Sequence, residues 1–245
     1  MFFNPGVKKK LISQRKYYND LLANLRLPGA AILDIGANVG FISEIFLDMG
    51  FGVVAVEPDP RNVSILKARF GLNRNFLLYP CLCGTEAGLQ QFWLSERNNA
   101  FSTNNLKWKN LLSGGNYRFH AHFMEDPIEI QATTLDEILR AHGKLVFAKI
   151  DAEGSELNCF QGLSEKIPLI AFEANLPEFA EETISCVQRL AAIDEGATFN
   201  YSSEFNLPGP EYLTAIEFCN LISTIRSPNI DVICRMSNYL EFYGA

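Results

Sequence analysis

Short runs of apolar residues alternate with stretches in which apolar residues recur every three or four positions, from Ala30 to about Ala192. The runs AAILDIG and FGVVAVEP are apolar almost throughout, which is typical of strands buried on both faces. Between them, apolar side chains recur at helical spacing: Ile42, Ile45, Phe46 and Met49. This order of strand, helix and strand predicts an α/β fold with a mostly parallel sheet that is covered by helices.

Capping residues mark further helix and strand boundaries. Asp59 and Pro60 suit the N-cap and first position of a helix, and Thr134 and Glu137 form a capping box. Further strands are predicted at NFLLYP, LQQFWL, IEIQAT, KLVFAKID and PLIAFEA, with a helical turn near Gly154. Beyond them, ISCVQRLAAI has a helical pattern, ATFNYS and IDVICR have strand patterns, and FNLPGP is a break.

Composition narrows the class of partner. The net charge of −7, from 28 acidic and 21 basic residues without a long basic run, makes a general nucleic-acid binder unfavourable and suits a neutral or cationic partner. The basic stretch KKKLISQRK at 8–16 is better explained as a solvated helix face than as a patch for an anionic surface. Six irregularly spaced cysteines, no signal peptide and no apolar stretch of about 18 to 20 residues indicate a cytoplasmic protein without a membrane span.

The stretch ILDIGANVGFIS places glycines after the first strand, where the backbone can turn without a Cβ clash and approach a ligand. Gly36 and Gly40 hold these positions, but Asn38 stands where the dinucleotide pattern G-x-G-x-x-G has its middle glycine. Glu57 follows Asp34 by 23 positions, at a strand end where a carboxylate can take ribose hydroxyls. These features favour a nucleoside ligand without a diphosphate, such as S-adenosylmethionine, over an ordinary strand-turn-helix with a surface acid.

Five motifs occur in the order DIGANVG, VVAVEPDP, TTLDEIL, FAKIDAEGSEL and FEAN. In this order they resemble the FkbM family of S-adenosylmethionine-dependent methyltransferases, within the class I methyltransferase superfamily, over about 30–174. The resemblance implies a Rossmann-like, seven-stranded sheet with helices on both faces. It also implies methyl transfer to an oxygen, often a hydroxyl of a sugar, glycan or small natural product, with S-adenosylhomocysteine as product. The cofactor contacts that it implies lie in the first two motifs, at Asp34, Gly36, Ala37, Asn38, Gly40, Glu57 and Pro58.

The whole chain, 1–245, is expected to form one methyltransferase domain, since its hydrophobic content of 48% allows one large core and no second core is required. A helical extension is expected at 1–29 and the cofactor-binding half at 30–94. The polar segment 95–127 has no strong period and is interpreted as an insertion or lid. The remainder, 128–245, is expected to supply the second half of the sheet and elements on the acceptor side.

Methyl transfer from a sulfonium is an in-line displacement, so the protein must hold the acceptor oxygen opposite the sulfur and take or share its proton. Asp151 and Glu153 are the candidates, at the sheet edge where Asp34 and Glu173 also end predicted strands. Asp151 could instead bind the cofactor's ammonium group, and Glu153 could charge the following helix. Lys149 shares a strand face with Asp151. Three roles are open for it: it lowers the pKa of a neighbouring carboxylate, it stabilises an alkoxide, or it extends into solvent at the strand end.

No metal site is expected, because His120, His122, Cys81 and Cys83 have none of the usual zinc spacings. Two readings stay open beside this: His122 as a general base, and a Mg²⁺ ion on strand-end carboxylates. Two other functions also stay open. The same strand-turn-helix suits a nicotinamide-dependent oxidoreductase, although the middle glycine is missing, and a catalytically silent nucleoside-binding module would keep the fold without turnover.

Overall fold

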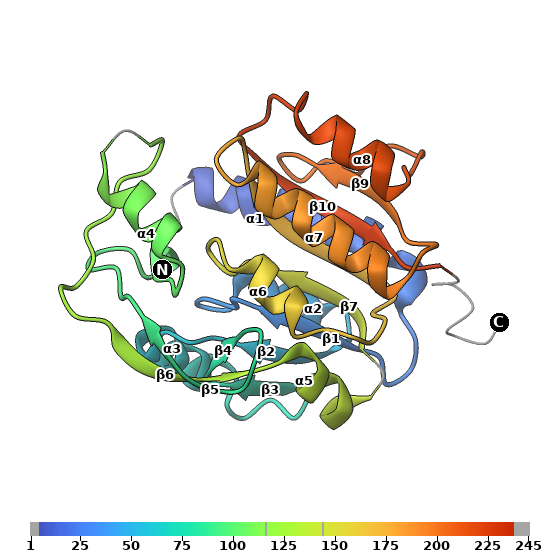
Figure 1. Ribbon diagram of the computed structural model, residues 1–245. Helices are drawn as coiled ribbons and strands as arrows, with labels where there is room; N and C mark the ends of the chain where they lie inside the picture. Colours follow the sequence, from blue (N-terminus) through green and yellow to red (C-terminus); the bar gives the residue numbers. More distant parts are fainter. Residues whose placement is uncertain (1–4, 116, 144, 238–245) are drawn as a thin grey trace.

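The computed structural model describes residues 5–115, 117–143 and 145–237, and its main sheet has seven strands (Figure 1). These are β1 (Ala31–Ile35), β2 (Gly52–Val56), β3 (Phe76–Tyr79), β7 (Leu145–Ile150), β8 (Leu169–Asn175), β9 (Thr198–Ser202) and β10 (Asn229–Arg235). They lie in the order β3-β2-β1-β7-β8-β10-β9. In the main sheet, β3, β2, β1, β7 and β8 are parallel to one another, and β10 is antiparallel to β8 and β9. The predicted mostly parallel, seven-stranded sheet is confirmed.

Helices cover both faces of this sheet (Figure 1). One face carries α1 (Pro5–Leu21), η1 (Ala23–Leu25), α2 (Phe41–Asp48) and α3 (Pro60–Phe70), and the other carries α5 (Leu135–His142), α6 (Glu156–Gln161), α7 (Ala180–Ile193) and α8 (Ala215–Ile222). Tyr18 and Phe46 are buried in the core of the first face, and Phe160 and Val187 in that of the second. None of the described helices is long and apolar enough to cross a membrane.

Local sequence explains several helix starts. Asp59 accepts a hydrogen bond from the backbone N–H of Arg61, with Pro60 at the first helical position. Thr134 and Glu137 form the predicted capping box at the start of α5. Helix α8 was not predicted, although its start has the same signal in Thr214 and Glu217.

A second, smaller sheet lies beside the main one, with β4 (Leu82–Cys83), β6 (Ile128–Thr133) and β5 (Gly88–Phe92) in the order β4-β6-β5. The strands predicted at LQQFWL and IEIQAT therefore form, but they pair with each other and not with the main sheet. Between them, the segment 95–127 contains two helices that the sequence did not predict, η2 (Asn99–Phe101) and α4 (Leu106–Ser113). Helix α4 stands apart from the helices that cover the sheet (Figure 1) and buries Trp108 against Phe179.

Candidate functional site

The strand order reverses between β1 and β7, where a parallel sheet opens a crevice at the carboxyl ends of its strands. The turn after β1 needs glycine at this point. Gly36 has a φ of +73°, and a Cβ there would lie 1.8 Å from the backbone oxygen of Asp151. Asn38 also adopts a positive φ, 52°, which asparagine tolerates better than most residues. The tight turn that was predicted thus forms without the middle glycine of a dinucleotide-binding loop.

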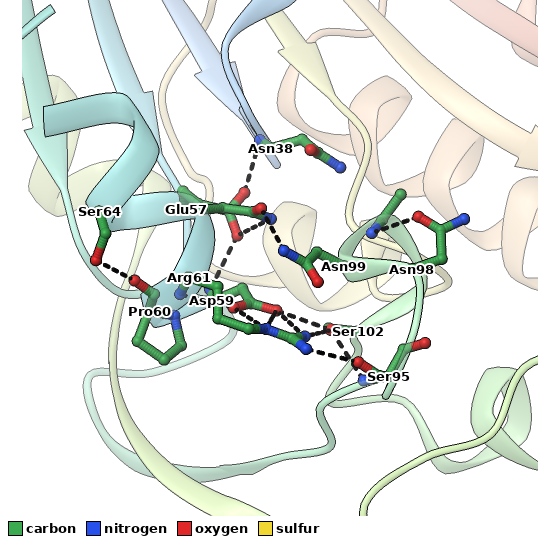
Figure 2. Close-up of polar contacts among 12 residues, drawn as sticks. Asn38, Glu57, Asp59, Pro60, Arg61, Ser64, Ser95, Asn98, Asn99 and Ser102 are labelled. Atoms are coloured by element: carbon green, nitrogen blue, oxygen red, sulfur yellow. Dashed lines mark hydrogen bonds and ion pairs between the residues drawn. The ribbon is translucent and has the colours of Figure 1, made fainter. Parts of the chain in front are cut away.

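Glu57 follows β2 and lies directly below this turn (Figure 2). Its carboxylate accepts hydrogen bonds from the backbone N–H groups of Asn38 (2.7 Å) and Asp59 (2.9 Å) and from the Asn62 amide (3.3 Å). Burial raises the Glu57 pKa to about 7, while these three donors oppose that shift. A carboxylate offers about four acceptor positions, so Glu57 keeps room for about one further donor, fewer than the two ribose hydroxyls expected from the sequence.

The insertion is tied to the start of α3 (Figure 2). The Arg61 guanidinium pairs with the buried carboxylate of Asp59 at 2.6 Å and donates to the backbone oxygen of Ser95 at 2.8 Å. The Ser102 hydroxyl donates to the same Asp59 carboxylate at 2.9 Å. The residues from 95 to 102 are therefore fixed beside Glu57 in this structure.

Two cavities meet at the glycine turn. The first, of about 130 Å³, is lined by six residues that the sequence singled out, Gly36, Asn38, Glu57, Pro58, Asp151 and Glu153. The second, of about 320 Å³, is lined by Asp34, Ala37 and Lys149, and again by Gly36, Asn38 and Asp151. Gly40 lines neither cavity. A Cβ there would lie 2.5 Å from the Phe70 ring and 2.7 Å from Leu66, so this glycine permits the close packing of α2 on α3.

Asp34, Lys149 and Asp151 form a row of charges beneath the turn. Asp34 lies opposite Lys149 in the pairing of β1 with β7, and the Lys149 ammonium is 2.8 Å from the Asp151 carboxylate. Burial alone would lower the Lys149 pKa, but the Asp151 and Asp34 carboxylates raise it above its usual value. Burial raises the Asp34 pKa, against the effects of Lys149 and of a 2.5 Å bond from the Ser43 hydroxyl. Lys149 therefore stays protonated and holds Asp151 in place.

Glu153 sits in a strained turn between β7 and α6. Its φ is 50°, and that of the following Gly154 is 88°, both in the left-handed region. Burial raises the Glu153 pKa well above its ordinary value, and the nearby carboxylates of Asp151 and Glu173 act in the same direction. A positive charge that binds beside this carboxyl group would favour its ionised form.

Three consecutive residues of the insertion hold this turn. The Thr103 hydroxyl donates to the backbone oxygen of Glu153 at 2.9 Å. The Asn105 side chain donates to the backbone oxygen of Gly154, and the Ser155 hydroxyl donates to the Asn104 side chain at 2.6 Å. We call the residues Thr103 to Asn105 the latch. The left-handed backbone at Glu153 is thus stabilised by contacts about fifty residues away in the chain.

Glu173 ends β8 on the other side of the crevice. It accepts hydrogen bonds from the Asn229 amide at 2.7 Å and the Asn175 amide at 3.0 Å, and Asn175 in turn accepts from Arg118 of the insertion. Burial and the Asp151 charge raise the Glu173 pKa to about 8. The predicted convergence of Asp34, Asp151 and Glu173 on one edge is therefore observed.

Glu156 and the histidines take other roles. Glu156 lies in the first turn of α6 and accepts a hydrogen bond from the backbone N–H of Ala152 at 2.8 Å. His120 and His122 pack on each other, with ring centroids 4.7 Å apart, and line neither of the two cavities. Among the residues that the structure describes, no group of three or more His, Cys, Asp or Glu is placed to hold a metal ion.

Sequence reasoning missed the insertion's part in the site. Asn99, Ser102 and Asn104 line the first cavity, and none of them was singled out. Asn105 carried a usable signal, because its side chain caps α4 by accepting from the backbone N–H of Trp108 at 3.0 Å. No sequence signal links the latch to Glu153, because that contact depends on tertiary packing.

Comparisons with known proteins point to one family. The model of the methyltransferase FkbM domain matches residues 34–196, about two thirds of the chain. This range begins at Asp34 near the end of β1 and includes the glycine turn, Glu57, the insertion and the turn after β7. Among curated proteins, none matches this chain.

Several solved structures are similar at low identity. The plantazolicin methyltransferase BpumL in complex with SAH is 12% identical, with 93% of this chain and 84% of that chain covered and a TM-score of 0.44. A SAM-dependent methyltransferase from Agrobacterium tumefaciens is 10% identical, with 93% and 61% covered and a TM-score of 0.44. A TehB-like SAM-dependent methyltransferase from Corynebacterium glutamicum is 10% identical, with 92% and 88% covered and a TM-score of 0.43.

Proposed function

We propose that this chain, which belongs to the methyltransferase FkbM domain family, transfers a methyl group from S-adenosylmethionine to a hydroxyl oxygen of a sugar, glycan or small natural product. The observation that carries the proposal is the position of Glu153, which lines the same cavity as Glu57. A nucleoside held at Glu57 and a proton acceptor at Glu153 are the two parts that methyl transfer to a hydroxyl needs. Membership in a methyltransferase family sets aside the oxidoreductase alternative.

S-adenosylmethionine is the methyl donor of this family, and the residues present fit it. Gly36 permits the close approach of the turn after β1 to the Asp151 backbone, and both residues line the two cavities. Glu57 is fixed by three protein donors and has acceptor capacity for about one ribose hydroxyl. When bound, the cofactor supplies an electrophilic methyl group on a positively charged sulfur.

Glu153 is proposed to accept the hydroxyl proton. Its raised pKa makes it a stronger base than an ordinary carboxylate once it has ionised, and a positive charge in the crevice favours the ionised form. Asp151 is already paired with Lys149, so its proposed role is to bind and orient ligands. The Lys149 ammonium, held protonated by its neighbours, adds positive potential where the acceptor oxygen gains negative charge.

The acceptor is proposed to bind beside the aromatic residues of the insertion, which suit a ring with hydroxyl groups. Tyr117 and Phe119 lie against each other with centroids 6.1 Å apart, and the Arg118 guanidinium lies over both rings. Arg118 also contacts Asn175, which leads to the carboxyl group of Glu173. Aromatic faces next to amide and carboxyl groups are suited to apolar sugar faces and their hydroxyls respectively, and the acidic edge disfavours an anionic acceptor.

The first experiment is a pair of calorimetric titrations of the purified protein with S-adenosylmethionine and with NAD. We expect saturable binding of the first and none of the second. Transfer of a labelled methyl group is then screened over sugars and hydroxylated natural products. If the protein binds neither S-adenosylmethionine nor S-adenosylhomocysteine, the proposal is wrong. Binding without methyl transfer to any acceptor would favour a catalytically silent nucleoside-binding module.

Glu153→Gln tests the proposed base. We expect kcat to fall by about 100-fold or more, a usual size for loss of a general base, while affinity for S-adenosylhomocysteine stays within about threefold. Glu195→Gln, at an exposed position far along the chain, is the matched control. An unchanged kcat in the Glu153 variant would assign proton transfer to another group.

A further inference from the structure

We infer that the second cavity, between α1 and the glycine turn, binds the amino-acid end of the cofactor and that Lys10 of α1 binds its carboxylate. This inference rests on the proposed function. The cavity, of about 320 Å³, is closed on one side by Lys10, Leu11 and Gln14 and on the other by Asp34, Lys149 and Asp151. It makes the helical extension a part of the binding site.

Connectivity is the first argument. The first cavity contains Glu57, the ribose partner, and the two cavities share Gly36, Asn38 and Asp151. In S-adenosylmethionine the nucleoside and the amino acid are joined through a single sulfur atom. A nucleoside seated at Glu57 therefore places its amino-acid end across the shared residues, in the direction of the second cavity.

Unpaired acceptors in the second cavity are the second argument. Oδ1 of Asp34 and Oδ1 of Asp151 are both buried, and no described residue donates a hydrogen bond to either. Asp34 is 0% exposed, and its other oxygen is taken by Ser43. Leaving such an oxygen unpaired costs free energy, and an ammonium group has three donors to supply. The two aspartates are thus suited to the cofactor's ammonium.

A cation for the carboxylate is the third argument. Lys149 already forms an ion pair with Asp151, whereas none of the ion pairs among the described residues involves Lys10. The Lys10 side chain lines the cavity, and its ammonium lies 5.9 Å from the centre of the Phe205 ring. Its charge also opposes the raised pKa of the buried Asp231 carboxyl group. Gln14 follows one helical turn later and faces the same cavity, with an amide as a second donor.

The remainder of α1 fixes this position. Tyr17 and Tyr18 are 2% and 1% exposed, and the Tyr18 ring packs edge-on against Phe46 of α2 at 5.0 Å. Because α1 is one continuous helix, this packing also sets where Lys10 and Gln14 lie. This packing therefore places the backbone of Lys10 and Gln14 beside the second cavity without a ligand.

Two ligands separate this role from a general effect. S-adenosylhomocysteine has the amino-acid end, and 5′-methylthioadenosine has the nucleoside and sulfur without it. In calorimetric titrations, we expect Lys10→Met to weaken S-adenosylhomocysteine binding about tenfold, the size of one hydrogen bond to a charged group, and to leave 5′-methylthioadenosine binding unchanged. Lys9→Met is the control, because Lys9 is exposed and does not line the cavity.

The outcomes are distinguishable. If the native protein binds S-adenosylhomocysteine and Lys10→Met binds it equally well, or loses both ligands to the same extent, Lys10 is not a carboxylate partner and this inference is wrong. If the native protein binds neither ligand, the proposed function fails, and the inference fails with it. Retained 5′-methylthioadenosine binding in Lys10→Met shows that the variant is folded.

Discussion

At the scale of single residues, the site depends on a close contact between two backbone segments that only glycine permits. Gly36 and Gly29 have nearly the same φ, +73° and +75°. They differ in surroundings, since a Cβ at Gly36 would meet the Asp151 backbone, whereas one at Gly29 would meet nothing within 4 Å. Alanine substitutions at these two positions therefore distinguish the effect of backbone strain from the effect of a steric clash.

We expect Gly29→Ala to cost about 1 to 2 kcal/mol in the free energy of unfolding, the usual penalty for a left-handed non-glycine residue. Gly36→Ala should cost more and should also abolish S-adenosylhomocysteine binding, because β1 and β7 must move apart. Urea unfolding and calorimetry measure the two effects. Equal behaviour of the two variants would show that the close approach at Gly36 is unimportant.

At the scale of elements, the structure shows which local signals decide a fold. Asp59 with Pro60 and Thr134 with Glu137 were predicted as helix starts, because capping depends on neighbouring residues alone. The side-chain pairing of Lys149 with Asp151 was also within reach, since strand residues two apart share a face. Helix α4 was missed because it is short and its apolar positions are anchored by Phe179.

The latch is an element that no local pattern contains. It holds the Glu153 turn through three hydrogen bonds between segments that are about fifty residues apart. Neither the left-handed backbone at Glu153 nor the contribution of the insertion to the cavity was therefore predictable from motifs. The charges at the ends of β1, β7 and β8 were predictable, because parallel strands end at one edge.

Thr103→Val should loosen this turn. We expect faster amide hydrogen exchange at 153–155 and a kcat about tenfold lower, with S-adenosylhomocysteine affinity nearly unchanged, because the variant removes a positioning contact and not a ligand contact. Thr224→Val is the control, since its hydroxyl also donates to a carbonyl, that of Leu221, at 2.8 Å, but far from the site. Unchanged exchange at 153–155 would contradict the role of the latch.

At the scale of the whole molecule, the crevice concentrates buried carboxyl groups. Burial raises the pKa of Glu57 and Glu156 to about 7, that of Glu173 to about 8 and that of Asp231 to about 6. A carboxyl group whose pKa is higher in the folded state than in the unfolded state stabilises the fold at low pH and loses this contribution as pH rises through the folded value. Stability of the ligand-free protein should therefore fall between about pH 5 and pH 8.5.

Glu156→Gln tests this trend at one position. A shift from an ordinary value of 4.5 to about 7 corresponds to about 3 kcal/mol between the two ends of the range. Since glutamine cannot ionise and its oxygen can still accept from Ala152, we expect this variant to lose less stability between pH 5 and pH 8.5 and to exceed the native protein at the higher pH. Urea unfolding at both pH values measures this difference, with Glu195→Gln as control. An equal loss of stability in the native protein and in Glu156→Gln would contradict the prediction.

The chain between 95 and 105 touches two places at once. Its beginning is bound to Asp59 and Arg61 beside Glu57, and its end is bound to the turn that carries Glu153. The proposed ribose partner and the proposed base are therefore connected by one short segment of chain. By thermodynamic reciprocity, whatever factor the methyl donor adds to the affinity for the acceptor, the acceptor must add to the affinity for the donor.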